Sequence, residues 1–226
     1  MAGRGDLLGG ATRRWRGGLA GILEALLPAA CAGCGRPCAD ALCGECHAAL
    51  GGGLVLPGVP RVIESFVAIG AYAGVAGQAV RALKFSGRRS LARTLGLRLA
   101  LVIGALPIRP DAVVAVPANP WRRLRRGHDP ALALARAVAD GLGLPVWRSL
   151  DRRRHGRPQS AAPDRRSNVR GAFVARGTLA GANLLLVDDV ITSGATALEA
   201  ALALRQAGAA RVWVAAAAHS RPGRAG

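Results

Sequence analysis

The segment LLLVDDVITSGAT, residues 184–196, determines which fold the chain can adopt. Its first four residues are apolar and predict a buried strand. Two carboxylates, Asp188 and Asp189, follow at the carboxyl end of that strand. Because ligands of open α/β sheets bind beside the carboxyl ends of the strands, the segment predicts both a parallel sheet and the place of its ligand site.

A loop of small residues follows the two carboxylates and leads into a predicted helix. Such a loop can point consecutive backbone N–H groups at an anion, and the helix N-terminus adds about half a positive charge. Carboxylates would repel a bare phosphate, but they suit the hydroxyls of an attached sugar or a magnesium ion beside it. The predicted ligand is therefore a sugar 5-phosphate. The residues expected to bind its phosphate are Thr192, Ser193, Gly194, Ala195 and Thr196. An ordinary strand–turn–helix stays open as the alternative, whereas a Walker-type nucleotide loop is excluded because no G-K-[ST] pattern is present.

Strands and helices alternate outward from this segment. We expect strands at 66–72, 112–117, 145–150, 172–175, 183–190 and 210–218, and helices at 75–84, 90–104, 130–143 and 195–208. This alternation is typical of a parallel sheet with helices on both faces. The segment 152–171 has no periodicity and predicts a long exposed loop with a functional role. The Gly- and Pro-rich segment 51–60 predicts a linker.

All five cysteines lie between residues 31 and 46. Four of them form two C-x2-C pairs separated by eight residues, a spacing that suits a tetrahedral structural zinc ion. The predicted ligands are Cys31, Cys34, Cys43 and Cys46. Cys38 and His47 are spare groups, and either can replace one ligand. A disulfide cluster and a redox C-x-x-C are the alternatives, and the odd number of cysteines argues against disulfides.

The composition excludes a disordered chain, because 51% of the 226 residues are hydrophobic and only 19% are charged. The formal net charge is +18, and of the 31 basic residues only Lys84 is a lysine. Codon bias can explain the arginine content, but a positive field also favours phosphates, nucleic acid or an acidic membrane surface. No apolar segment reaches the roughly 20 residues needed to span a bilayer. Glu24 and Pro28 argue against an export signal, so we expect a cytoplasmic protein.

These observations divide the chain into three parts. We expect an N-terminal arm with a short helix at 1–29, a zinc-binding module with its linker at 30–58, and an α/β domain at 59–226.

Residues 184–196 resemble the phosphoribosyl pyrophosphate (PRPP) signature of type I phosphoribosyltransferases. The rest of the chain is similar to the ComF/GntX branch, which is associated with competence and DNA uptake. The similar positions are the two C-x2-C pairs, Tyr72 and Gly74, LKFSG (83–87), VVAVP (113–117), RRG (125–127), Gln159, Arg165 with Asn168, and GAF (171–173). The resemblance implies a type I phosphoribosyltransferase-like fold with a small N-terminal zinc-binding module whose ligands are four cysteines.

The resemblance also implies roles for individual residues. Asp188 and Asp189 would contact the ribose hydroxyls, and 192–196 would hold the 5-phosphate. The loop 117–127 would meet the pyrophosphate, and its candidate donors are Arg122, Arg123, Arg125 and Arg126. A solvated basic face is the alternative for these arginines, although a guanidinium fork suits phosphate. Mg²⁺ would accompany PRPP, and the loop 152–171 would close over the site and exclude water.

This chain departs from the family pattern where it reads RGHDPA (126–131) in place of R-G-F-N-Q-A, and no residue is a candidate general base. Three functions stay open. The first is an enzyme that transfers a phosphoribosyl group to a nitrogen nucleophile and releases pyrophosphate. The second is a PRPP-sensing protein that holds single-stranded DNA on its basic face, with Trp121 as a stacking residue. In the third, the cysteine module docks a DNA-processing or competence protein.

Overall fold

The computed structural model describes residues 30–153 and 170–220, except for the side chains of Ser86 and Arg122. The predicted N-terminal arm lies outside the described residues. So does most of the predicted loop 152–171, with Gln159, Arg165 and Asn168.

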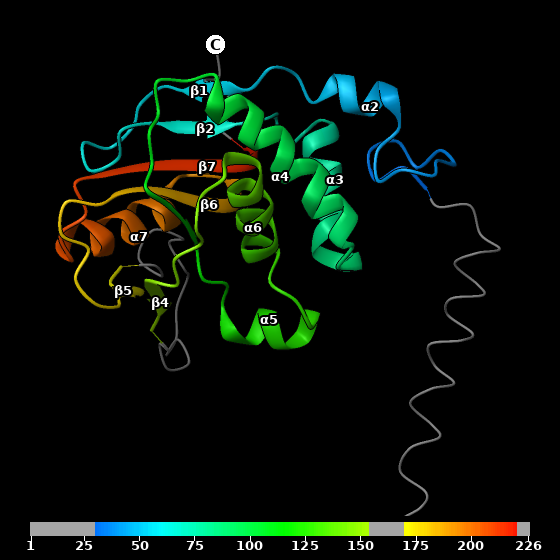
Figure 1. Ribbon diagram of the computed structural model, residues 1–226. Coiled ribbons are helices and arrows are strands. Elements are labelled where there is room, and N and C mark those ends of the chain that lie inside the picture. Colours follow the sequence, from blue (N-terminus) through cyan, green and yellow to red (C-terminus); the bar gives the residue numbers. More distant parts are fainter. Residues whose placement is uncertain (1–29, 154–169, 221–226) are drawn as a thin grey trace, which may run out of the picture.

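One five-stranded sheet forms the centre of the molecule (Figure 1). Its order is β1 (Leu54–Leu56), β2 (Phe66–Ala68), β7 (Arg211–His219), β6 (Asn183–Ile191) and β3 (Ala112–Ala115). All neighbours are parallel except β1, which runs antiparallel to β2. The predicted parallel sheet is therefore confirmed.

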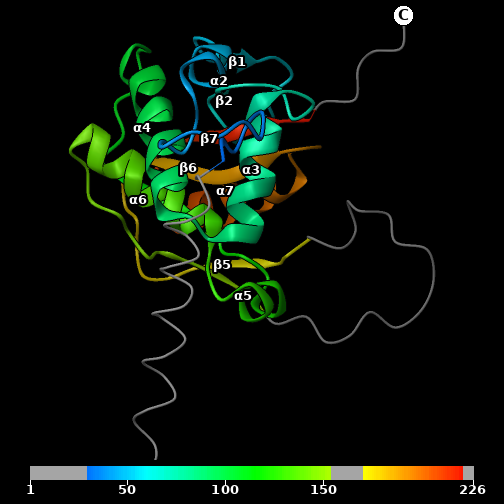
Figure 2. The ribbon, with the colours of Figure 1, turned by 90° about the vertical axis from the view of Figure 1, so that its right-hand side faces the viewer.

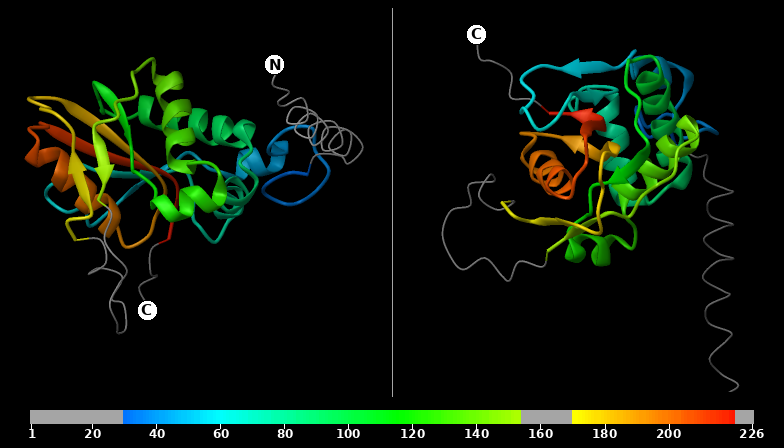
Figure 3. Two further views of the ribbon diagram at one scale, coloured as in Figure 1. Left: turned by 90° about the horizontal axis from the view of Figure 1, so that it is seen from below. Right: turned by 60° about the vertical axis from the view of Figure 1, so that its left-hand side comes forward.

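Helices cover both faces of this sheet, as the sequence predicts. One face carries α3 (Val75–Ser86), α4 (Arg89–Gly104) and α6 (Pro130–Leu142), and the other carries α7 (Ala195–Gln206) (Figure 3). Strand β6 supplies both cores, because Leu185 and Val187 pack on the first face while Leu184 and Leu186 pack on the second. Its side chains alternate between two apolar layers, which explains the uninterrupted hydrophobic run in the sequence.

Three segments differ from the sequence predictions, and the first two concern strands. The predicted linker 51–60 contains β1, a three-residue edge strand whose Leu54 and Val55 are exposed; flanking Gly and Pro residues hid it. The predicted strand 145–150 makes only a single parallel bridge, from Val146 to Val113. A separate two-stranded sheet follows, in which β4 (Leu150–Arg152) pairs with β5 (Phe173–Ala175).

The predicted loop 117–127 is also wrong in part, because it contains helix α5 (Pro120–Arg126). Asn119 caps this helix by accepting a hydrogen bond from the backbone N–H of Trp121 (3.0 Å), and Pro120 occupies its first turn. Gly127 ends the helix in the left-handed conformation. Its sequence, PWRRLRR, has no apolar stripe, so periodicity could not reveal it.

The cysteine segment packs against the helical face beside α3 (Figure 2). It contains a short helix, α2 (Gly44–Ala49), and its buried residues Cys31, Cys46 and Leu50 belong to the same hydrophobic core as α3 and α4. The division at residues 58 and 59 stays a prediction, although a shared core crosses it. Within the described ranges, no helix has both the length and the apolar character that a membrane crossing requires.

Candidate functional site

The two adjacent carboxylates lie at the carboxyl end of β6, where the sequence predicts the ligand site. The backbone N–H of Asp189 donates a hydrogen bond to Asp188 Oδ1 (2.7 Å). Asp189 Oδ1 lies 2.9 Å from Nζ of Lys84, which comes from the last turn of α3. The side chains of Lys84 and Asp189 are 21% and 15% exposed, so this ion pair is largely shielded from water. The two acids are therefore held close together, and among the described residues a cation pairs with Asp189 but not with Asp188.

The electrostatics of Asp188 differ from those of an ordinary surface carboxylate. Burial raises its pKa to about 7, and the neighbouring Asp189 charge acts in the same direction. The N–H of Asp189 and the charge of Lys84 oppose this rise. Near neutral pH, Asp188 therefore exchanges between a carboxylate, which only accepts hydrogen bonds, and a carboxylic acid, which also donates one.

The loop between β6 and α7 leaves its backbone donors available. The N–H groups of Thr192, Ser193, Gly194 and Thr196 donate to no other group in the described part of the chain. Ala195 N–H makes a long hydrogen bond to Ser193 Oγ (3.4 Å). Together with the start of the 12-residue helix α7, these N–H groups form a concentration of positive partial charge. The arrangement is able to bind an anion such as a phosphate.

Gly194 shapes this loop. Its φ of 79° lies in the left-handed region, and a Cβ at this position would sit 3.2 Å from Phe66 Cζ. Only glycine adopts this conformation without strain. The sequence therefore needs glycine here to bring the chain from the strand into α7.

A cavity of about 530 Å³ lies beside the same loop. Loop residues 191–195 form one wall, and apolar side chains of Pro60, Phe66 and Leu198 form much of the rest. Arg170 and Glu199 supply charged groups, and Glu199 accepts a hydrogen bond from the backbone N–H of Gly171 (2.8 Å). Neither of the two aspartates lines this cavity, so the acids and the cavity meet different parts of the loop.

The candidate pyrophosphate arginines lie on α5. Arg123 and Arg125 are exposed, Arg126 is half-buried, and the side chain of Arg122 is outside the described set. In the described residues, no ion pair joins these arginines to the two aspartates. The structure thus brings Asp188, Asp189 and the loop together, but among the described side chains it pairs no arginine of α5 with the two aspartates.

Two of the three residues that depart from the family pattern, His128 and Asp129, have structural roles. One ring nitrogen of His128 lies 2.9 Å from the backbone oxygen of Leu83, and the other lies 2.9 Å from that of Arg126. His128 thereby connects the end of α3 to the end of α5. Asp129 caps α6 by accepting a hydrogen bond from Leu132 N–H (3.2 Å).

Lys84 is the site residue that the sequence analysis did not identify. It belongs to LKFSG (83–87), which entered only as part of the resemblance. One signal was available: it is the single lysine in a chain whose other basic residues are all arginine. A lysine kept against such a bias indicates a position that needs a compact ammonium group.

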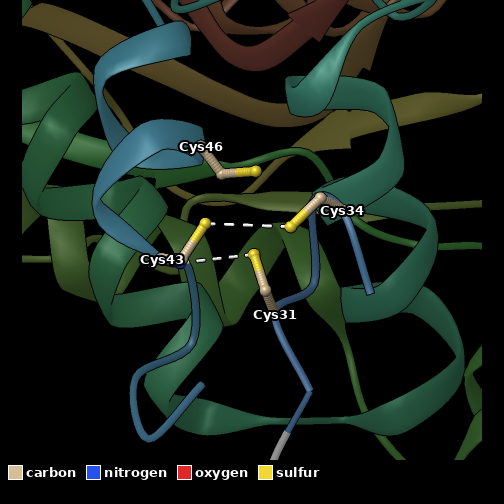
Figure 4. A group of neighbouring side chains, drawn as sticks. All are labelled: Cys31, Cys34, Cys43 and Cys46. Atoms are coloured by element: carbon tan, nitrogen blue, oxygen red, sulfur yellow. Dashed lines mark hydrogen bonds between the residues drawn. The ribbon is translucent and has the colours of Figure 1, made fainter. Parts of the chain in front are cut away.

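The four predicted metal ligands point toward one another (Figure 4). Their sulfur atoms all lie within 4.8 Å of one another, and Cys34 Sγ is 3.7 Å from Cys43 Sγ. Zn–S bonds of about 2.3 Å place neighbouring sulfurs about 3.8 Å apart in a tetrahedron, so the cluster fits a metal ion such as zinc. Cys38 and His47 are not part of this group.

The electrostatics of the cluster also favour a cation at its centre. Burial raises the pKa of Cys31, but hydrogen bonds from backbone N–H groups, such as that of Cys43 (3.2 Å), outweigh it and bring the pKa to about 6. Burial and the neighbouring thiols raise the pKa of Cys46 to about 12. The pKa of Cys34 is lowered as well, chiefly by a hydrogen bond from the Arg36 side chain. The cluster thus favours thiolates at Cys31 and Cys34 on its own and needs a bound cation to stabilise all four.

Comparisons with known proteins identify relatives that match most of the chain. No family model matches the chain. The chain is 30% identical over 162 residues to competence protein F of Haemophilus influenzae, a match that covers 67% of this chain and 71% of the relative. It is 32% identical over 196 residues to DNA utilization protein YhgH of Salmonella typhimurium, which covers 81% of each chain. Among solved structures, glutamine PRPP amidotransferase from B. subtilis, complexed with ADP and GMP, is 27% identical with a TM-score of 0.43, over 60% of this chain and 30% of that chain.

The fold and the site together define an α/β protein with a mostly parallel sheet, helices on both of its faces, and a cluster of four cysteines able to hold a metal ion. The curated relatives define it further. The chain belongs to the ComF family, in agreement with the resemblance found in the sequence.

Proposed function

We propose that this protein binds PRPP and transfers its phosphoribosyl group to a nitrogen nucleophile with release of pyrophosphate. One observation carries the proposal: a loop with four unpaired N–H groups, counted within the described residues, lies directly between the acidic end of β6 and the start of α7. The amides and the helix suit the 5-phosphate, and the carboxylates suit the ribose hydroxyls. The names of the relatives support a role in competence and DNA uptake.

Each part of PRPP then has a proposed partner. Residues 192–196 bind the 5-phosphate, and Asp188 and Asp189 bind the ribose 2- and 3-hydroxyls. Arg122 and Arg126, from α5, are the proposed donors to the pyrophosphate. Mg²⁺ enters with PRPP and neutralises part of its pyrophosphate charge.

The proposed reaction needs positioning more than proton transfer. The bond from ribose C1 to the pyrophosphate oxygen breaks with its electron pair going to pyrophosphate, and a bond from C1 to the nitrogen forms as that nitrogen loses a proton to solvent. Holding the sugar phosphate at both ends aligns the reacting atoms, and fixed charges stabilise the positive charge that develops on the ribose. This suits a site that lacks an evident general base.

We further propose that the cysteine cluster holds a structural zinc ion. Its four ligands are all protein sulfurs, which leave no open position for catalysis. The ion would stabilise a segment that contributes only a few residues to the core. Because thiolates persist in reducing compartments, this assignment supports a cytoplasmic location.

Calorimetric titration of PRPP, with and without Mg²⁺, tests the binding proposal. We expect micromolar-range binding to the wild type and at least a tenfold loss in Asp189→Asn. The control is Asp140→Asn, which changes an exposed carboxylate at the end of α6. If PRPP does not bind the wild type, the proposal is wrong. Pyrophosphate release is then measured with ammonia, glutamine and a panel of nucleobases, and silence across the panel alongside intact binding would reject the transfer step.

A second function, binding of single-stranded DNA, has its own supporting observation. Phe85, Trp121 and Leu124 are 78%, 79% and 76% exposed, and they lie among arginines where His128 joins α3 to α5. Exposed aromatic rings stack on bases, and arginines attract the phosphate backbone. Docking of a DNA-processing or competence protein by the cysteine segment is the competing function.

Fluorescence anisotropy with a labelled oligo-dT strand tests this second function. Affinity should fall linearly with salt on a log–log plot, and Trp121→Ala should weaken binding about 5- to 100-fold. Leu101→Ala, an exposed apolar residue of α4, serves as the control. Unchanged affinity in Trp121→Ala would remove the stacking role.

A further inference from the structure

Lys84 forms an ion pair that differs from the others in the described part of the chain. Of the three ion pairs there, Arg36–Glu45 and Arg176–Asp151 join side chains that are 47% to 77% exposed, whereas Lys84 and Asp189 are only 21% and 15% exposed. A lysine ammonium loses its strong hydration when it is buried. Shielding a lysine from water therefore costs free energy unless its charge interacts with an anionic group.

The position of Lys84 is fixed from two directions. Helix α3 ends two residues after it, at Ser86, because Gly87 adopts the left-handed conformation (φ 62°) and its N–H donates to the Leu83 carbonyl. The same carbonyl lies 2.9 Å from Nε2 of His128, whose other ring nitrogen contacts the Arg126 carbonyl at the end of α5. Lys84 is thereby held between the acidic end of β6 and the arginine-bearing helix α5.

This placement leaves donors of the ammonium available. A lysine has three N–H donors, and in the described residues its recorded partner is Asp189 alone. The remaining exposed fraction of the side chain lets a ligand reach the other two. The ammonium is also small enough to fit between two anionic groups, where the planar guanidinium of arginine would require a wider, bidentate geometry.

We propose that Lys84 is a binding residue that bridges Asp189 and the pyrophosphate of bound PRPP. This inference rests on the proposed function. It adds Lys84 as the cation that offsets the repulsion between the two aspartates and the pyrophosphate. The ribose-binding carboxylates lie next to the place where a multiply charged pyrophosphate must sit, and like charges at such distances repel. A fixed cation that contacts both removes this repulsion without a metal ion, and binding of PRPP then depends only in part on Mg²⁺.

The decisive experiment compares two ligands, PRPP and ribose 5-phosphate, which lacks the pyrophosphate. Both are titrated calorimetrically into wild type and Lys84→Met, with and without Mg²⁺. Without Mg²⁺, we expect Lys84→Met to lose about 10- to 100-fold in PRPP affinity and less than about threefold in ribose 5-phosphate affinity. With Mg²⁺, the PRPP loss should shrink. Lys84→Arg keeps the charge but not the compact geometry, and it should recover only part of the affinity.

The control is Arg176→Met, which also removes one cation from an ion pair but lies on the surface. An equal loss for both ligands in Lys84→Met would mean that the lysine only orients Asp189 and would overturn the inference. Unchanged affinities would overturn it too, while the proposed function would stand because the wild type binds PRPP. If the wild type binds neither ligand, the proposed function itself fails.

Lys84→Met leaves Asp189 with an unpaired shielded charge, which can prevent folding. The double variant Lys84→Met with Asp189→Asn removes both charges and is compared with Asp189→Asn alone. The inference requires that the double variant bind PRPP more weakly than the single variant Asp189→Asn does. The two variants should bind ribose 5-phosphate with equal affinity. Equal PRPP affinities of these two variants would overturn it.

Discussion

The substitution Asp188→Asn should make the protein more stable at alkaline pH. Asparagine has the size of aspartate and keeps an oxygen that accepts the hydrogen bond from Asp189 N–H. It removes the charge that burial and Asp189 disfavour, the same two causes that raise the pKa of Asp188 from 3.8 to about 7. The free energy of unfolding of the variant should therefore exceed that of the wild type above neutral pH.

The size and sign of the effect follow from proton linkage. Because the folded protein holds the Asp188 proton more tightly than the unfolded chain, the stabilising contribution of this group is fully present below pH 4 and is lost as the pH rises toward 7. Between pH 5 and pH 8 the loss is on the order of 2–3 kcal/mol, since each pKa unit corresponds to about 1.4 kcal/mol. The asparagine variant does not titrate and escapes this loss.

Urea denaturation of both proteins at pH 5, 6, 7 and 8 measures the effect. We expect the difference in unfolding free energy, variant minus wild type, to grow by about 2–3 kcal/mol over this range. Asp140→Asn, at an exposed position, should show a difference that does not change with pH. A pH-independent difference for Asp188→Asn would refute the claim that this carboxyl is held protonated by its surroundings.

Three further outcomes are expected. Cys43→Ser should lose the metal, as measured by mass spectrometry of bound zinc, and should lower the melting temperature, whereas Cys38→Ser should keep both, because its sulfur is not in the cluster. Gly194→Ala should cost about 1–2 kcal/mol of stability and at least tenfold in PRPP affinity, because φ is 79° there. Gly181→Ala, with φ of 74° and open space around it, should show the strain without the loss of affinity. His128→Ala should lower the free energy of unfolding by about 1–3 kcal/mol, because the ring that connects the end of α3 to the end of α5 and its hydrogen bond to a backbone carbonyl are lost; equal stability in urea would contradict that role.

The sequence predicted the helices and strands that have a local hydrophobic pattern of their own. The apolar run of β6 and the helical periodicity of α4 and α6 located these elements, because buried strands and amphipathic helices impose their own spacing. Helix α5 was not predicted, because capping groups at its two ends define it and it has no apolar face. Strand β1 was not predicted, because three residues are too few to show the alternation of a strand.

The residues of the candidate sites also fall into those that a local sequence pattern predicts and those that only tertiary packing brings into place. Asp188, Asp189 and the loop after them are neighbours in sequence, and the four cysteines lie within 16 residues, so the spacing alone brings each group together. Lys84 reaches Asp189 only through the packing of α3 against the sheet, and no local pattern records such a contact. The same holds for the two contacts of His128, a residue that the sequence analysis noted only as a departure from the family.

Helix α3 joins the two candidate sites into one structure. Its first residue, Val75, packs against the core that contains Cys31 and Cys46, and its last turn carries Lys84 to Asp189. The helix has 12 residues and, at 1.5 Å per residue, separates these ends by about 18 Å. A packed helix moves as a unit, so a shift of its first turn is transmitted to its last. A metal ion bound by the cysteine segment would therefore also help to hold Lys84 in place, which gives a physical reason for one chain to carry both sites.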